Sequence, residues 1–376
     1  MTKSSLILLA ALVSGLTAHA GSISFDTRAD LLSNDYDNAS TSADNTQFKL
    51  DTVRLDSKGK LNDSVSYRLR LRFNEDRSTT GTVSKRDSTG ADLDLAFVTN
   101  KFNDSMALTV GKFATDMGGY EGSVSGADLY MKTIGNGGGR GIGDKYYTGT
   151  KFAYSFADQE VALHVANQTA DASGLANDGT TTGAFNQNKF MTGLVYKGTF
   201  MDKALTAIAS YHTQEGRFNS SAGAPTAPGT DDPKYKNTYM AVGAKYDTDM
   251  FTVDADYLMH TLGGYTVAYS ATQAAKDDTL NTMQVGFAYK MDQWTPRLKI
   301  ESSTATKASA TVADTKYTYT GTQLAIEYKP VKDDMFRYHL AYWSRDTKTD
   351  VPSSASVTTT DKFIVLGTRI MADFLK

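Results

Sequence analysis

The sequence contains no cysteine and little proline. With 0 Cys in 376 residues, the fold holds together without disulfides, and thiol chemistry is excluded. Only 6 prolines stand against 31 glycines, which suits many turns and leaves no proline-rich linker between domains. The net charge of −3, with Lys and Arg spread along the chain, excludes a nucleic-acid-binding protein. We therefore predict a single domain without nucleic acid as a partner.

Long apolar runs are also missing, apart from one at the N-terminus. Lys3, the apolar run 6–16 and the small-residue pattern Ala18-His19-Ala20 predict a signal peptide over 1–20 that is cleaved before Gly21. The run is too short for a transmembrane helix, which needs roughly 20 apolar residues. A mature chain of this kind enters a membrane only as a closed β-barrel, in which strands satisfy every backbone group. Export directed by the signal peptide is compatible with insertion as such a barrel.

Alternation of apolar and polar residues predicts strands along the rest of the chain. In one example Phe251, Val253 and Ala255 alternate with Asp254 and Asp256, which places apolar and polar side chains on opposite faces. The predicted strands are 23–32, 47–58, 63–74, 90–101, 105–113, 146–156, 160–168, 189–198, 204–214, 237–247, 250–260, 279–291, 294–305, 317–330, 335–346 and 361–374. In 47–58 the alternation changes phase, and we predict a β-bulge near Thr52-Val53.

The connections between these segments alternate strictly between long and short. The short ones have two to five residues and the long ones eleven to thirty-two. Outer-membrane barrels pair short periplasmic turns with long external loops, and their strands have about 9–11 residues. A soluble sheet gives no reason for such sorting. The pattern predicts an all-β fold, a transmembrane antiparallel up-and-down barrel of 16 strands with its long loops outside.

Three arginines share one face of the predicted strand 63–74. Arg68, Arg70 and Arg72 alternate with leucines, and each arginine facing lipid would cost roughly 2–4 kcal/mol near the bilayer midplane. We therefore expect this arginine row to face the lumen, joined by Arg28 and Arg54 from neighbouring strands. For any single arginine, the alternative is that it lies on a polar face in contact with water and has no role in the pore.

The longest connection, 114–145, resembles the third long loop of the trimeric bacterial porins. It contains Gly118-Gly119-Tyr120-Glu121-Gly122, where that family often has an acidic-aromatic-Gly-Gly run. The resemblance covers nearly the whole mature chain in pattern. It implies that the loop folds into a 16-stranded barrel and faces basic wall residues. By that resemblance Asp116, Glu121 and Asp128 are candidates for the acidic side of a constriction, opposite Arg54 and the arginine row. An ordinary surface loop is the alternative.

No catalytic, cofactor or metal site is predicted. The four histidines of the mature chain lie on separate strands without zinc-site spacing, and no Ser–His pair is evident. The pairs Asp92/Asp94 and Asp254/Asp256 face the lumen, where a divalent cation or a wet wall would suit them. Phe374 lies near the C-terminus, where the porin family tends to end on an aromatic residue, but Leu375 and Lys376 follow it.

These observations favour a porin in the outer membrane of a Gram-negative bacterium. It would form a water-filled channel for passive diffusion of ions and small hydrophilic solutes, with some anion preference because of the arginine row. The resemblance implies a homotrimer in a lipid bilayer with lipopolysaccharide. The alternatives are an outer-membrane barrel enzyme of the phospholipase or protease type, and a structural surface adhesin.

Overall fold

A computed structural model describes most of the chain after residue 20. The described residues are 21–36, 45–75, 89–136, 145–167, 190–217, 234–263, 278–307, 313–331, 335–352 and 354–375. The predicted signal peptide, most of the long connections and the end of the glycine-rich run lie outside the described residues. Among the described residues, no helix is long and apolar enough to cross a membrane.

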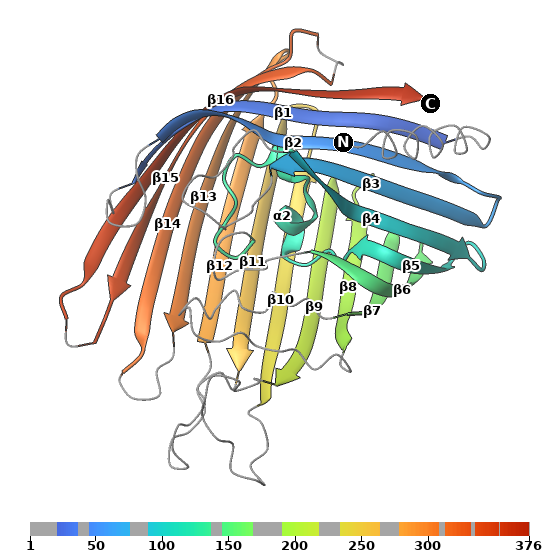
Figure 1. The fold of residues 1–376 in the computed structure, drawn as a ribbon, viewed down its shortest axis with the longest axis horizontal. Helices are drawn as coiled ribbons and strands as arrows, with labels where there is room; N and C mark the ends of the chain where they lie inside the picture. Colours follow the sequence, from blue (N-terminus) through green and yellow to red (C-terminus); the bar gives the residue numbers. More distant parts are fainter. Residues whose placement is uncertain are drawn as a thin grey trace.

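All sixteen predicted strands are present, and they close into one antiparallel barrel (Figure 1). Each strand pairs with its sequence neighbours, and β1 pairs with β16 to close the ring. The strands are β1 (Gly21–Tyr36), β2 (Asn45–Lys60), β3 (Val65–Glu75), β4 (Thr89–Lys101), β5 (Met106–Ala114), β6 (Tyr146–Phe156), β7 (Gln159–Asn167), β8 (Phe190–Phe200), β9 (Leu205–Arg217), β10 (Lys234–Asp247), β11 (Phe251–Gly263), β12 (Asp278–Tyr289), β13 (Trp294–Lys307), β14 (Thr315–Tyr328), β15 (Arg337–Asp350) and β16 (Val357–Leu375).

The two faces of the barrel wall differ as the alternation predicts. On β12, Met283 and Val285 are exposed on one face, while Thr282 and Gln284 are buried on the other. The same division holds on β14, where Leu324 is exposed. Apolar side chains thus cover the outer face, and polar side chains line the inner face, as a barrel in lipid around an aqueous interior requires.

Two β-bulges shift the register on β2 and β4, and a third shift, between Ile23 and Ser24 in the pairing of β1 with β16, leaves Phe374 unpaired. The predicted bulge on β2 is confirmed and lies at Asp51, because Arg28 pairs with Thr52 while Ala29 pairs with Leu50. A second bulge on β4 was not predicted, and there Asp94 is the unpaired residue. Each bulge adds one residue to its strand and leaves the inner-face pattern of the neighbouring strand intact.

The short connections form tight turns along one rim. Asn103 Oδ1 accepts hydrogen bonds from the backbone N–H groups of Ser105 and Met106, at 2.9 and 2.8 Å. Asn62 does the same for Ser64 and Val65, at 2.9 and 2.8 Å. Such Asx turns satisfy the backbone donors locally. We call this side of the barrel the short-turn rim, formed by residues 61–64, 102–105, 157–158, 201–204, 248–250, 290–293 and 329–331.

The connection after β5 contains two short helices. They are α2 (Gly119–Ser123) and the 3₁₀ helix η1 (Gly126–Asp128). Gly118 and Gly119 precede and open α2 with φ of 90° and 71°, a left-handed conformation that glycine adopts at little cost. α2 contacts β9, β10 and β11, and η1 contacts β2.

Candidate pore lining and constriction

Segment 115–136 is hydrogen-bonded to the inner face of the barrel wall at many points. Asp256 of β11 accepts hydrogen bonds from the backbone N–H groups of Tyr120 and Glu121, at 2.5 and 2.9 Å. The N-cap residue of α2, Gly118, has no side chain with which to satisfy these donors. The barrel wall therefore supplies the cap that this helix lacks.

Two glycines make room for the Asp256 carboxylate. A Cβ at Gly119 would lie 2.4 Å from Asp256 Oδ1, and one at Gly243 of β10 would lie 1.8 Å from the same atom. Either contact is far shorter than van der Waals distance. The close approach of α2 to the wall thus depends on both glycines.

Glu121 is buried between this segment and β13. Its carboxylate accepts hydrogen bonds from Lys299 Nζ at 2.6 Å, from Thr133 N at 3.1 Å and from Asn136 Nδ2 at 3.0 Å. Burial alone would raise the pKa of Glu121, but the charge of Lys299 and the hydrogen bonds from Thr133 outweigh it and lower the pKa. Glu121 is therefore an ionised anchor of the segment.

Asp128 lies between two arginines of β15 and β16. Its Oδ1 accepts hydrogen bonds from Arg337 Nη1 at 3.0 Å and from Arg369 Nη1. Burial would raise the pKa of Asp128, yet attraction to Arg369 and Arg337 lowers it. Asp116, at the start of the segment, forms an ion pair with Lys197 of β8 at 2.7 Å.

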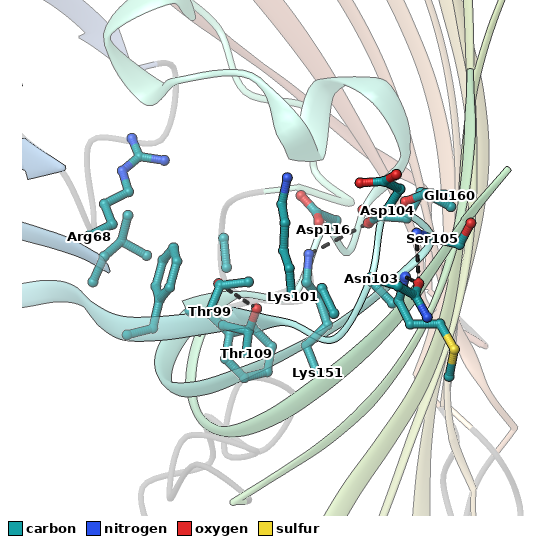
Figure 2. Close-up of a pocket in the computed structure, with 18 residues that line it drawn as sticks. Arg68, Thr99, Lys101, Asn103, Asp104, Ser105, Thr109, Asp116, Lys151 and Glu160 are labelled. Atoms are coloured by element: carbon teal, nitrogen blue, oxygen red, sulfur yellow. Dashed lines mark hydrogen bonds and ion pairs between the residues drawn. The ribbon is translucent and has the colours of Figure 1, made fainter. Parts of the chain in front are cut away.

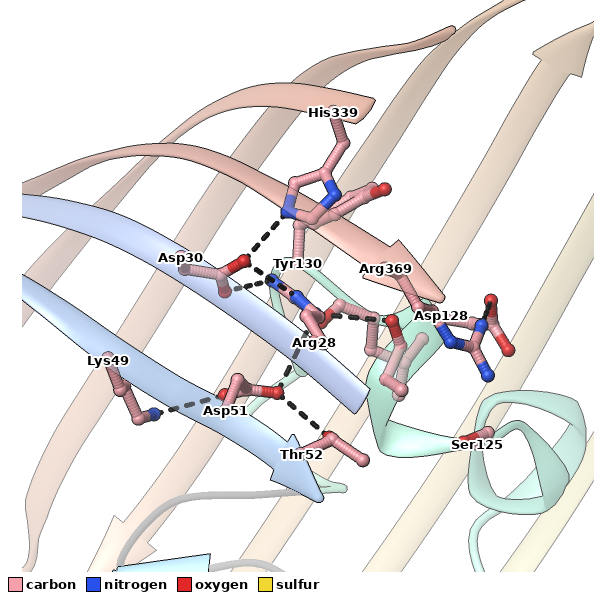
Figure 3. A network of polar contacts seen from close by, with 12 residues as sticks. Arg28, Asp30, Lys49, Asp51, Thr52, Ser125, Asp128, Tyr130, His339 and Arg369 are labelled. Atoms are coloured by element: carbon pink, nitrogen blue, oxygen red, sulfur yellow. Dashed lines mark hydrogen bonds and ion pairs between the residues drawn. The ribbon is translucent and has the colours of Figure 1, made fainter. Parts of the chain in front are cut away.

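Arg28 of β1 binds the segment through its backbone (Figure 3). Its Nη1 donates to the carbonyl of Leu129 at 2.9 Å, and its guanidinium lies 4.8 Å from the centroid of the Tyr130 ring. Asp30 holds the same guanidinium in an ion pair of 2.8 Å. Arg28 is only 3% exposed, so it positions the segment and offers little surface to a solute.

Further contacts continue along β13, β14 and β15. They are Ile134 N to Glu301 at 2.6 Å, Met131 N to Gln323 at 2.8 Å, Tyr130 Oη to Glu327 at 2.8 Å and Arg345 to the carbonyl of Lys132 at 2.6 Å. Burial, together with the negative charge of Glu327, raises the pKa of Tyr130, which stays protonated and donates its hydrogen bond. Strand alternation predicts that these wall residues lie on the inner face. It does not predict which residues of the segment they bind.

The arginine row of β3 has its partners on the neighbouring strands. Arg68 and Arg70 both bind Asp56 of β2, with their shortest contacts at 2.6 and 2.8 Å. Arg72 binds Asp94 of β4 at 2.6 Å. All three remain partly exposed on the inner face, and Arg68 is the most exposed, with 35% of its side chain accessible.

Arg54 links the arginine row to segment 115–136. Its Nη1 donates to Ser125 Oγ at 2.9 Å, and its Nε lies 3.9 Å from Asp94. Within the described part of the chain, Asp116, Glu121 and Asp128 form ion pairs with Lys197, Lys299, Arg337 and Arg369. That these carboxylates form the acidic side of a constriction opposite Arg54 and the arginine row stays a prediction. The inner-face position of Lys299, Arg337 and Arg369 follows from strand alternation, but their pairing with these carboxylates does not.

The acidic pairs that suggested a divalent cation have other partners. Asp94 binds Arg72, and Asp256 caps α2 and accepts a hydrogen bond from Gln284 at 2.8 Å. Among the described residues, no group of three or more His, Asp or Glu side chains is arranged to hold a metal ion.

A family model described as phosphate-selective porin O and P matches residues 25–374. The chain belongs to this porin family. It is therefore an outer-membrane porin, a channel for passive diffusion, and the resemblance to sixteen-stranded porins is confirmed. No curated protein sequence matches the chain significantly.

Solved outer-membrane barrels share the fold at low sequence identity. The outer membrane channel DcaP of Acinetobacter baumannii has a TM-score of 0.66 and 12% identity, with 94% of this chain and 97% of that chain covered. The anion-selective porin from Comamonas acidovorans has a TM-score of 0.63 and 10% identity, covering 94% and 99%. OmpT of Vibrio cholerae in its trimer form has a TM-score of 0.57 and 18% identity, covering 94% and 100%.

Proposed function

We propose that this porin conducts anions in preference to cations, and that the arginine row sets the sign. Five cations of this inner face (Arg54, Lys58, Arg68, Arg70 and Arg72) stand against three carboxylates (Asp56, Asp92 and Asp94), so this part of the wall keeps an excess of two positive charges. In a narrow passage with low-dielectric walls such an excess raises the local concentration of anions. This charge excess is the observation that carries the proposal.

We further propose that segment 115–136 folds into the lumen and narrows it. Its anchors run from Lys197 on β8, through Asp256 and Lys299, to Arg369 on β16 and Arg54 on β2. A segment tied to these strands leaves the sector in front of β3–β7 as the passage. Arg68, Arg70 and Arg72 line that passage on the wall side. Asp116, Glu121 and Asp128 then act chiefly as anchors, because cations of the wall neutralise them.

The matching family is described as phosphate-selective. The arrangement of the arginine row is compatible with an oxyanion as one permeant solute. The forks of Arg68 and Arg70 already bind a carboxylate, Asp56, which has the planar oxygens that guanidinium groups recognise. A phosphate oxygen would compete with Asp56 for the same donors. Other small hydrophilic anions would pass by the same route.

The partners of the channel follow from its class. We propose a homotrimer in a bilayer that contains lipopolysaccharide, with the long connections outside and the short-turn rim toward the periplasm. A trimer form of a protein with this fold supports the first part. We also propose that the protein is not an enzyme: His164 contacts His212, His260 contacts Asn237 and His339 contacts Asp30, and these partners do not include the serine of a nucleophile–base pair.

Planar-bilayer recordings test the proposal. The purified protein should conduct in KCl, and a salt gradient should give a reversal potential of the sign expected for anions. Absence of conductance would overturn the channel, and a cation-type potential would overturn only the anion preference. Chemical cross-linking of the purified protein should yield a trimer.

A further inference from the structure

A cavity at the short-turn rim between β3 and β7 has an unusual lining (Figure 2). It has a volume of about 430 Å³ and is lined by apolar as well as charged side chains. Phe97, Leu95 and Phe113 supply the apolar part, and Lys101 and Lys151 point into the cavity. A volume of this size lies within the ordinary range for sites that bind small molecules.

Three clusters of apolar residues on the inner face include residues of segment 115–136. Met117 packs with Leu258 and Tyr239, Tyr130 packs with Val365, and Ile134 packs against another cluster on β12–β14. Phe97 belongs to none of these three clusters among the described residues and remains partly exposed in the cavity. The segment therefore does not account for the partly exposed aromatic ring of Phe97 in this cavity.

The cross-strand neighbours of Phe97 leave its ring accessible. Phe97 pairs with Arg68 of β3 on one side and with Gly111 of β5 on the other, and Gly111 pairs with Gly149 of β6, so no side chain of this row lies beside the ring on the β5–β6 side. Gly111 has φ of 128°, and a Cβ there would lie 2.2 Å from the carbonyl oxygen of Ala96. Glycine is thus required at this position, and the recess beside Phe97 is built into the wall.

One positive charge in the cavity is uncommitted. Lys151 forms an ion pair with Glu160 at 3.5 Å, and Arg68 binds Asp56. Lys101 lies on the same face as Phe97 and, within the described part of the chain, forms no ion pair. Asp104, Asp116 and Glu160 also line the cavity, so a dianion would meet more repulsion there than a monoanion.

The geometry points to a subsite for monoanions that carry an apolar body, such as aromatic monocarboxylates. The ring of the solute would stack on Phe97 over the glycine recess, and its carboxylate would bind the ammonium of Lys101. This inference rests on the proposed function, because a bound solute reaches the cavity only through an open passage. The arginine row alone would favour any anion over a cation. The subsite would add a preference for organic anions over inorganic ones.

Blocking of the KCl current by benzoate, acetate and phosphate, added at the short-turn side, tests the subsite. Benzoate should bind about tenfold more tightly than acetate, because stacking removes part of an aromatic ring from water. Phe97→Ala should bring benzoate to the level of acetate, whereas Phe97→Leu should retain part of the difference. Lys101→Gln should weaken both carboxylates.

Lys329→Gln is the matched control, since Lys329 lines a different cavity at the same rim. It should change neither carboxylate. Equal blocking by benzoate and acetate in the unaltered protein would overturn the subsite while leaving the channel intact, as would a benzoate preference that survives Phe97→Ala. KCl conductance in each variant shows that the barrel has folded, and its loss in the unaltered protein would overturn the channel itself.

Discussion

Two parts of the inner wall carry cations of the same kind and use them differently. On β13–β16, Lys299, Arg337 and Arg369 bind carboxylates of segment 115–136. On β3, Arg68 and Arg70 bind Asp56 of the adjacent strand and stay partly exposed. The first set fixes a segment against the wall, and the second set presents charge to the passage. Basic residues on the inner wall therefore fix the segment where its carboxylates reach them, and they remain exposed to the passage where the segment does not reach them.

The difference between the two sets is also a difference in burial. The side chains of Lys299 and Glu121 are 10% and 2% exposed, while that of Arg68 is 35% exposed. Removing one partner of a buried ion pair leaves an uncompensated charge, which is costly, whereas exposed pairs contribute little. Substitutions in the two sets should therefore act on different properties of the channel.

The largest effect is expected from Lys299→Met. Glu121 would remain buried without its cation, at a cost to docking of the segment of about 3–5 kcal/mol. Single-channel conductance should rise and become noisy as the segment leaves the wall. Lys348→Met is the control, because Lys348 and Asp350 form an exposed pair at 3.1 Å. Unchanged conductance in Lys299→Met would contradict the role of this pair in docking.

Acid should release the same segment without mutation. Asp128 has a pKa below its ordinary value of 3.8, so its ionised form stabilises docking above that pH, and the contribution is lost as pH falls through the lowered pKa. Conductance should stay constant between pH 7 and about pH 4 and rise below that range. The variant Asp128→Asn should show the raised conductance already at pH 7. Equal conductance of Asp128→Asn and the unaltered protein at pH 7 would speak against this anchor.

A smaller effect, on selectivity alone, is expected from Arg70→Gln. The ratio of anion to cation permeability should fall about fivefold, the factor that corresponds to about 1 kcal/mol for a unit charge at 4 Å in water. Conductance should change little, because Arg70 does not hold segment 115–136. Lys362→Gln, in an exposed pair with Asp35, is the control. Reversal potentials measure the ratio, and an unaltered value would remove the arginine row from the mechanism.

The smallest effect concerns Lys145, at the end of the connection after β5. Its Nζ donates to the carbonyl of Gly122 and to Asn136 Oδ1, and burial lowers its pKa to about 8. Its positive charge therefore disfavours docking below pH 8, and this cost disappears as pH rises toward 10.5, the ordinary value. Current noise should decrease between pH 7 and pH 10. In Lys145→Met the noise should no longer depend on pH in this range.

The strands could be predicted because the barrel imposes a period of two on residues that face lipid on one side. The bulge at Asp51 left a trace for the same reason, since the phase visibly changes between Leu50 and Val53. The bulge at Asp94 left none. Asp92-Leu93-Asp94-Leu95 alternates without a break, yet Leu95 lies on the inner face and is 2% exposed. A bulge is invisible in the sequence when the residue moved inward is apolar.

The site could be predicted only in part. Arg28, Arg54 and the arginine row follow from their strand faces, and so do Lys299, Arg337 and Arg369. The partners of Asp116, Glu121 and Asp128 depend on the path of an irregular segment, which no periodicity records. Gly243 illustrates the limit: it is one glycine on a strand, and its purpose appears only once the Asp256 carboxylate is seen to fill the space beside it.

Closure of the barrel between β1 and β16 has a consequence for biogenesis. The last hydrogen-bonded ladder joins residues from opposite ends of the chain, from Ile23 with Leu375 to Tyr36 with Asp361. Until the final strand is available, the sheet has two open edges that lipid cannot solvate. The polypeptide must therefore be complete, and kept from pairing with other chains, before it can insert. Until β1 and β16 pair, both edges must stay out of contact with the lipid core and with the edges of other chains.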